Sequence, residues 1–150
     1  MNKRGENMKY VINGIFLTQK ITGVQRYGIE LLKALDNIEY ALDIEVLIPE
    51  YENTNIAFKR LKVIKYGKKS KKIWQQYDYM KYLIKNNAIG ICLSCPAPLF
   101  YNRKCIVVIH DMATCAHPEF YSKKYLLRNK IFMLNGVVKA KKILTVSEFS

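Results

Sequence analysis

The sequence predicts a fold of the α/β class built on a largely parallel sheet. Short apolar runs rich in β-branched residues alternate along the chain with segments whose apolar residues recur at helical spacing. The runs are apolar throughout, which is typical of strands buried on both faces of a sheet. Strands separated by helices also require crossover connections, which are nearly always right-handed. Together these observations predict a Rossmann-like, doubly wound, mostly parallel sheet in one domain of 150 residues, half of them hydrophobic.

The first half of the chain predicts three strands and two helices. The expected strands cover residues 10–16, which Asn13 and Gly14 interrupt late, and then 44–48 and 61–64. The first helix is expected over residues 23–37, where apolar residues recur at Val24, Tyr27, Leu31 and Leu35. The second helix is expected over residues 70–87, with an apolar face made of Ile73, Trp74, Tyr77, Met80, Leu83 and Ile84.

The second half predicts three further strands, over residues 89–93, 105–109 and 143–146, and one long helix over 122–142. The apolar positions expected on that helix are Leu126, Leu127, Met133, Leu134, Val137 and Val138. Residues 1–7 are expected to form a disordered tail, so that the folded domain spans 8–150. The last strand runs into Ser147, a good N-cap for a following helix, which predicts the first half of a two-domain protein.

The charge of the chain suggests an anionic partner without naming one. The formal net charge is +13, and the basic residues are mostly lysines that cluster in residues 59–72 and 123–142, where no acidic residue occurs. An anionic membrane surface and a nucleic acid are both compatible with such clusters, and so is a coding bias that only solvates the outer faces. The preference for lysine over arginine argues against nucleic acid, because bidentate phosphate and base contacts favour arginine.

Neither a membrane-spanning run nor a signal peptide can be recognised in the sequence, so the expected location is the cytoplasm, with a possible peripheral position at the inner membrane leaflet. Cys92 and Cys95 form a C-x-x-C pair, which raises the possibility of zinc or redox chemistry. However, Cys105 and Cys115 do not provide a second close pair, and Cys92 and Cys105 lie within apolar runs. We therefore expect buried free thiols and no metal site.

Ligands of open parallel sheets bind beyond the carboxyl ends of the strands, which selects the loops 17–23, 94–101, 110–119 and 147–150. In the first of these, Gly23 opens a helix whose N-terminus suits a phosphate, with Thr22 before it and Arg26 one turn later. A simple glycine turn between a strand and a helix remains an alternative, because no G-x-G-x-x-G or P-loop pattern is present.

The second candidate constellation follows the most apolar strand, where His110 and Asp111 stand side by side. A histidine there can act as a general base or bind a sugar hydroxyl, and Asp111 can orient it; a purely structural His110 is the alternative. His117, before Pro118, is expected to be structural. The third constellation is Ser147 and Glu148, whose alternative is an ordinary capping turn.

Three motifs in order resemble the N-terminal domain of GT-B glycosyltransferases of family 4, particularly mannosyl- and rhamnosyltransferase-like members. They are FLTQKITGVQRYGIELLKAL, VVIHDMATCAHPEFYS and AKKILTVSEFS, and the resemblance extends from about residue 8 to residue 150. It implies retaining transfer of a sugar from a nucleotide-diphosphate donor to a hydroxyl of a cell-surface polysaccharide or lipid-linked acceptor, without a metal or another cofactor. It places Gly23 near the donor diphosphate, His110 and Asp111 near the transferring sugar or acceptor, and Ser147 and Glu148 along the cleft floor.

The sequence departs from this family at two points. Many relatives carry two glycines in the first loop, where this chain has Thr22 and Gly23. The donor-binding pair E-x-x-x-x-x-x-x-E, which relatives carry in a C-terminal domain, does not occur in the sequence. We therefore expect the 150-residue chain to be inactive alone and to need a donor domain in the same chain or in a partner. The alternatives are a non-catalytic module that binds such a partner and, less favoured, a basic nucleic-acid-binding domain.

Overall fold

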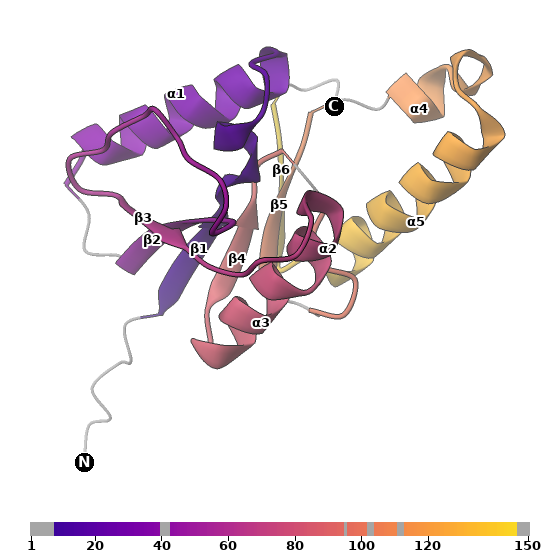
Figure 1. Ribbon diagram of the computed structural model, residues 1–150. Coiled ribbons are helices and arrows are strands. Elements are labelled where there is room, and N and C mark those ends of the chain that lie inside the picture. Colours follow the sequence, from indigo (N-terminus) through magenta and orange to yellow (C-terminus); the bar gives the residue numbers. More distant parts are fainter. Residues whose placement is uncertain (1–7, 40–42, 95, 102–103, 111–112, 147–150) are drawn as a thin grey trace.

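Six parallel strands form a single sheet, in the order β3-β2-β1-β4-β5-β6 (Figure 1). The computed structural model describes residues 8–39, 43–94, 96–101, 104–110 and 113–146. The strands are β1 (Lys9–Asn13), β2 (Asp43–Ile48), β3 (Lys62–Lys65), β4 (Ile89–Cys92), β5 (Cys105–Ile109) and β6 (Lys142–Thr145). The helices are η1 (Gly14–Thr18), α1 (Gly23–Asn37), α2 (Lys71–Gln76), α3 (Asp78–Lys85), α4 (Ala113–Ala116), η2 (Pro118–Phe120) and α5 (Lys123–Lys139). The predicted Rossmann-like α/β fold is confirmed.

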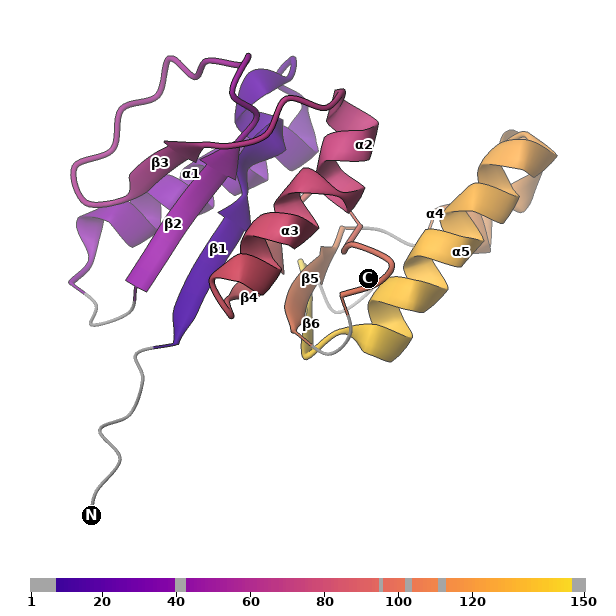
Figure 2. The ribbon, with the colours of Figure 1, turned by 60° about the horizontal axis from the view of Figure 1, so that its bottom comes forward.

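Helices cover both faces of the sheet (Figures 1 and 2). Successive residues of β1 point to opposite faces, so Val11 belongs to the core beneath α2 and α3, whereas Ile12 belongs to the core beneath α1. Val107 of β5 belongs to the same core as Val11, and Gly136 of α5 lies against it. Helices α2, α3 and α5 therefore share one face, and α1 covers the other.

Two predicted elements differ from the expectation: the first strand is shorter, and the second helix is broken in the middle. The first strand stops at Asn13, not at residue 16, because the side-chain oxygen of Asn13 accepts a hydrogen bond from Ile15 N and caps the short helix η1. The predicted helix over residues 70–87 is two helices, which meet at Tyr77. The break rotates the buried face, so Trp74, Tyr79 and Leu83 are buried while Ile73, Tyr77 and Ile84 are exposed.

The long helix α5 is covered far less than its apolar pattern predicted. Leu127, Leu134, Val137 and Val138 are exposed, and Gly136 is the buried residue among those described for this helix. The N-terminal half of α5 projects from the body of the molecule (Figure 2). The last strand, β6, is also poorly covered: its Leu144, which pairs with Val108 on the α1 side of the sheet, is exposed.

A buried tyrosine joins the two central strands. The hydroxyl of Tyr79 donates a hydrogen bond to Val11 O of β1 at 2.7 Å and accepts one from Ile91 N of β4 at 3.1 Å. Gly90 makes room for this hydroxyl, because a Cβ at that position would lie 2.9 Å from it. The contact fixes β1 against β4 below the edge of the sheet where the candidate site lies.

A second anchor holds the segment before β3. The carboxylate of Asp36, near the end of α1, accepts hydrogen bonds from the backbone N–H groups of Lys59, Arg60 and Leu61 at 2.7, 2.7 and 2.9 Å. Desolvation acts to raise the pKa of Asp36, but the three backbone donors and the charge of Lys59 outweigh it and hold the pKa below its ordinary value.

Candidate functional site

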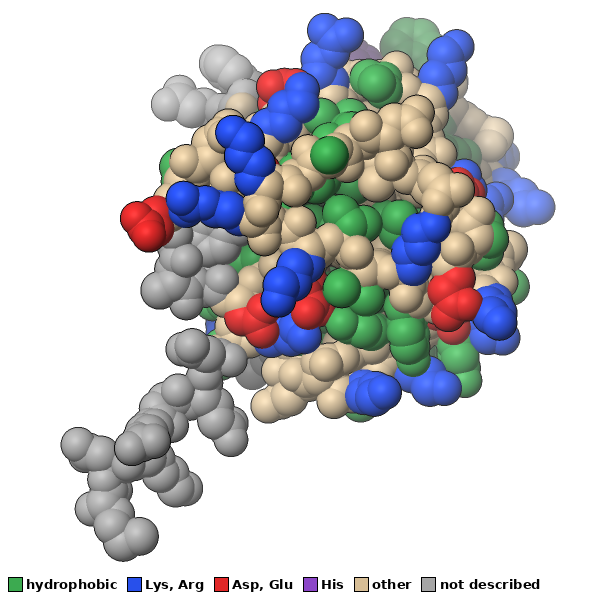
Figure 3. All heavy atoms as spheres, turned by 60° about the vertical axis from the view of Figure 1, so that its left-hand side comes forward, with side chains coloured by type: hydrophobic (Ala, Val, Ile, Leu, Met, Phe, Trp, Pro, Cys, Tyr) green, Lys and Arg blue, Asp and Glu red, His purple; other side chains and the backbone are tan. Residues whose placement is uncertain are grey.

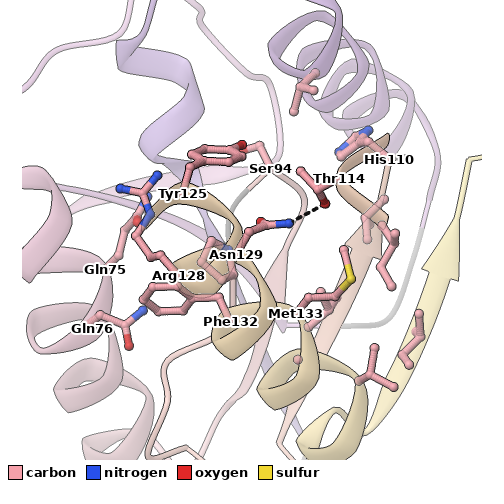
Figure 4. Close-up of a pocket in the computed structure, with 18 of the residues that line it drawn as sticks. Gln75, Gln76, Ser94, His110, Thr114, Tyr125, Arg128, Asn129, Phe132 and Met133 are labelled. Carbon is pink, nitrogen blue, oxygen red and sulfur yellow. Dashed lines mark hydrogen bonds between the residues drawn. The ribbon is translucent and has the colours of Figure 1, made fainter. Parts of the chain in front are cut away.

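A pocket of about 610 Å³ lies between α2 and α5 (Figure 4). Its floor includes Val107 and Val108 of β5, and it extends to Val24 in the first turn of α1 and to His110, directly after β5. The strand order changes direction between β1 and β4, and parallel sheets bind ligands beyond the carboxyl ends of their strands at such a point. The pocket therefore reaches the edge of the sheet that the sequence selected.

His110 lines the pocket with a fixed ring orientation. Its Nε2–H donates a hydrogen bond to the carbonyl oxygen of Leu93, at the end of β4. The ring also makes an edge-to-face contact with Tyr27 of α1, with centroids 5.1 Å apart. Because a carbonyl oxygen only accepts, this hydrogen bond places a proton on Nε2. His110 is thus held between α1 and the end of β4, in an orientation suited to binding a hydroxyl.

The first turn of α1 combines an open surface with a helix N-terminus that the Thr22 side chain does not cap. The hydroxyl of Thr22 donates to Oε1 of Gln25, and its side chain accepts no bond from the helix backbone. A Cβ at Gly23 would meet no atom within 4 Å, so the space above this residue is open. Arg26 is exposed one turn further along. Backbone N–H groups and the helix dipole make such a terminus favourable for an anion.

The structure brings together some of the predicted site residues. The contact between Tyr27 and His110 joins the helix that begins at Gly23 to the end of β5. Asp111, Ser147 and Glu148 lie outside the described residues. His117 is exposed, and its Nδ1 lies 3.2 Å from Oε1 of Glu119, so it contributes to a surface contact and does not line the pocket.

Several polar residues of the pocket were not singled out from the sequence. They come from α2, from α5 and from the segments after β4 and β5, and are Lys72, Gln75, Gln76, Ser94, Thr114, Tyr125, Arg128 and Asn129. Ser94 opens a loop that the strand-end rule had selected, so its position was foreseeable. Thr114 also lies in a selected loop, 110–119. The residues of α2 and α5 were not foreseeable, because polar positions on an amphipathic helix are expected to face solvent.

Two polar contacts shape the walls of this pocket. Asn129 Nδ2 donates a hydrogen bond to Thr114 Oγ1 at 2.7 Å, which ties α5 to α4 (Figure 4). Gln76 Oε1 accepts a hydrogen bond from Leu99 N at 2.9 Å, which ties α2 to the loop after β4. Ser94 Oγ is buried and has no hydrogen-bond partner among the described residues.

Two of the three described cysteines are buried, as predicted, and the third is exposed. Cys92 and Cys105 are buried on neighbouring strands, whereas Cys115 is exposed; Cys95 lies outside the described residues. A hydrogen bond with Cys92, together with burial, raises the pKa of the Cys105 thiol far above its ordinary value, so it remains protonated. The described residues contain no group of three or more His, Cys, Asp or Glu side chains placed to hold a metal ion.

Comparison of the sequence with protein-family models found no match, and neither a curated protein nor a solved structure matches the chain. Among the helices in the described part of the chain, none has the length and hydrophobicity needed to cross a membrane.

Proposed function

We propose that this chain is the acceptor-side, N-terminal domain of a retaining GT-B glycosyltransferase. The reaction would transfer a sugar from a nucleotide-diphosphate donor to a hydroxyl of a cell-surface polysaccharide or lipid-linked acceptor. The observation that carries the proposal is one pocket that extends from the first turn of α1 to His110, which follows β5 next to the switch point between β1 and β4 of a Rossmann-like sheet. The three family-like motifs of the sequence support the same assignment.

Each end of the pocket has a separate role in this proposal. The uncapped turn at Gly23 would bind the donor diphosphate through backbone N–H groups, with Arg26 adding charge nearby. His110, oriented by Leu93 and Tyr27, would position the reacting hydroxyl. A second domain, in the same chain or in a partner, would supply the remaining donor contacts and close the site.

Sugar transfer by the native protein from a panel of nucleotide-diphosphate sugars tests this proposal. We expect His110→Gln to reduce transfer at least 100-fold, by analogy with the usual contribution of a general acid or base. His117→Gln is a matched control, because His117 is exposed and does not line the pocket. Absence of transfer from every donor, or equal losses in both variants, would contradict the proposal. Transfer by the purified 150-residue chain alone would contradict the need for a donor domain.

A peripheral position at an anionic membrane surface is part of the proposal, and the outer side of α5 supports it. Four residues spaced by four, three and four positions are each more than half exposed: Leu127, Ile131, Leu134 and Val138. The cations of α5 take part in none of the ion pairs among the described residues. An apolar stripe flanked by lysines is typical of helices that lie in a membrane interface.

The lysine cluster over residues 59–72 differs from that of α5. Lys71 pairs with Glu52 at 2.7 Å, and Lys68 lies 3.8 Å from Glu50. On the face toward the left of Figure 1, acidic side chains lie among the basic ones (Figure 3). Membrane binding is therefore assigned to α5 rather than to this cluster.

Cosedimentation with anionic and zwitterionic vesicles at several salt concentrations tests the membrane assignment. We expect binding to anionic vesicles that weakens with salt, with a loss of about 1 kcal/mol for each of Lys123→Gln, Lys124→Gln and Lys130→Gln. Lys62→Gln, on β3, serves as the control. Binding that does not respond to salt, or an equal loss in the control, would contradict the assignment.

A further inference from the structure

Positive charge lines the pocket between α2 and α5. Two cations line it, Lys72 of α2 and Arg128 of α5, and the described lining residues include no Asp or Glu. Neither cation belongs to the ion pairs formed among the described residues. A cleft lined by charge of one sign raises the local concentration of ligands of the opposite sign. The charge of the pocket thus favours an anionic ligand.

Arg128 is placed to contact such a ligand. Its guanidinium lies 5.3 Å from the ring centroid of Tyr125, one turn earlier on α5. The side chain reaches from α5 toward Gln75 of α2 (Figure 4). A guanidinium presents parallel N–H donors that match a phosphate or a carboxylate, and the amide of Gln75 is a further donor. This region of the pocket therefore fits a single anionic group.

The remainder of the pocket is largely apolar. Its lining includes Val107, Phe132, Met133, Val137 and Ile143, which come from β5, α5 and β6. An apolar surface of this kind gains free energy when hydrocarbon replaces water on it. The ligand that fits the pocket combines an anionic group with an apolar body.

The edge of the sheet supplies a polar end to the same pocket. Ser94, after β4, and His110, after β5, both line it. Ser94 Oγ is shut off from solvent and has no hydrogen-bond partner among the described residues.

We propose that this pocket binds the acceptor as an anionic amphiphile, a phosphate or carboxylate joined to an apolar body. Arg128 and Lys72 hold the anionic group, the apolar residues of β5, α5 and β6 hold the body, and His110 lies at the polar end of the pocket. This inference rests on the proposed function for the identification of the ligand as an acceptor. The binding of the amphiphile itself does not depend on catalysis.

Calorimetric titration of the 150-residue chain with dodecyl phosphate, below its critical micelle concentration and without any sugar donor, tests the inference. We expect dodecyl phosphate to bind at least tenfold more tightly than dodecyl maltoside, which has the same alkyl chain without the charge, and more tightly than inorganic phosphate. Arg128→Gln should weaken the binding of dodecyl phosphate at least tenfold, and Lys72→Gln should weaken it less, because a lysine acts as a point charge.

Lys62→Gln is the matched control, since it removes one positive charge at an exposed position of β3 outside the pocket. It should change the affinity less than twofold. Circular dichroism verifies the fold of each variant, and Lys72→Gln keeps the test decisive if Arg128→Gln does not fold. Equal binding of the two dodecyl compounds, or an equal loss in Lys62→Gln, would overturn the inference. So would inorganic phosphate binding as tightly as dodecyl phosphate, because the apolar body would then contribute nothing.

The outcome separates this inference from the proposed function. Binding of dodecyl phosphate that depends on Arg128, in a protein that transfers no sugar, would support the pocket assignment and contradict the glycosyltransferase. Sugar transfer that Arg128→Gln leaves unchanged would support the glycosyltransferase and overturn the pocket assignment.

Discussion

Removal of one hydroxyl group tests the contact that fixes the two central strands. Tyr79 is fully buried, and its hydroxyl bonds Val11 O at 2.7 Å and Ile91 N at 3.1 Å. Tyr79→Phe keeps the ring and deletes both bonds, leaving two backbone groups without this partner. A loss of this kind costs about 1–3 kcal/mol of unfolding free energy. For a chain of this size, about 2 kcal/mol corresponds to a decrease in Tm of roughly 4–8 °C.

Urea unfolding followed by circular dichroism measures this cost, and Tyr51→Phe provides the control. The hydroxyl of Tyr51 also donates to a carbonyl, that of Lys69 at 2.9 Å, but the side chain is 49% exposed and water can replace the bond. We expect Tyr51→Phe to change the unfolding free energy by less than about 0.5 kcal/mol. If Tyr79→Phe is no more destabilising than Tyr51→Phe, the hydroxyl of Tyr79 does not stabilise the pairing of β1 with β4.

Three further substitutions test the turn before α2, the Asp36 anchor and the start of α1. Gly67→Ala should reduce the free energy of unfolding by about 1–3 kcal/mol, because Gly67 has φ +81° and a Cβ would lie 2.5 Å from Asp78. The urea midpoint should fall accordingly, and an unchanged midpoint would refute this. The stability that Asp36 contributes should be complete above its unfolded pKa of 3.8 and should be lost as the pH falls through the lowered native pKa. Asp36→Asn should therefore reduce the decrease in unfolding free energy that the protein shows at acidic pH, the acid limb of its pH–stability profile. An acid limb that keeps its slope in the variant would argue against this role. Gly23→Ala should preserve stability, since the space is open, yet weaken transfer by the native protein if a diphosphate approaches there; unchanged transfer would remove Gly23 from the site.

The elements predicted best are those whose signal is local. β5 spans the predicted residues 105–109, because a continuous apolar run specifies a buried strand, and α1 spans the predicted residues 23–37 through its helical periodicity. The break at Tyr77 was missed because the apolar pattern continues through it. In such cases the tertiary packing, and not the periodicity, decides where one helix ends and the next begins.

The candidate site was predictable at its strand ends and not along its helices. His110 follows an apolar strand, so the strand-end rule placed it correctly. Helix α5 has apolar residues on two sides, for example Met133 in the pocket and Leu134 exposed. Periodicity alone does not decide which side meets the sheet, and Arg128 was therefore not recognisable as a pocket residue.

The position of the pocket follows from the handedness of the crossovers. The connection from β1 to β2 moves across the sheet in one direction, and α1 covers one face. The connections from β3 to β4 and from β5 to β6 move in the opposite direction, so right-handed crossovers place α2, α3 and α5 together on the other face. The described residues between β4 and β5 form no helix, so this face lacks a helix between those on either side. The strand order and the missing crossover helix together leave β5 as a floor, α2 and α5 as walls, and His110 at the open end.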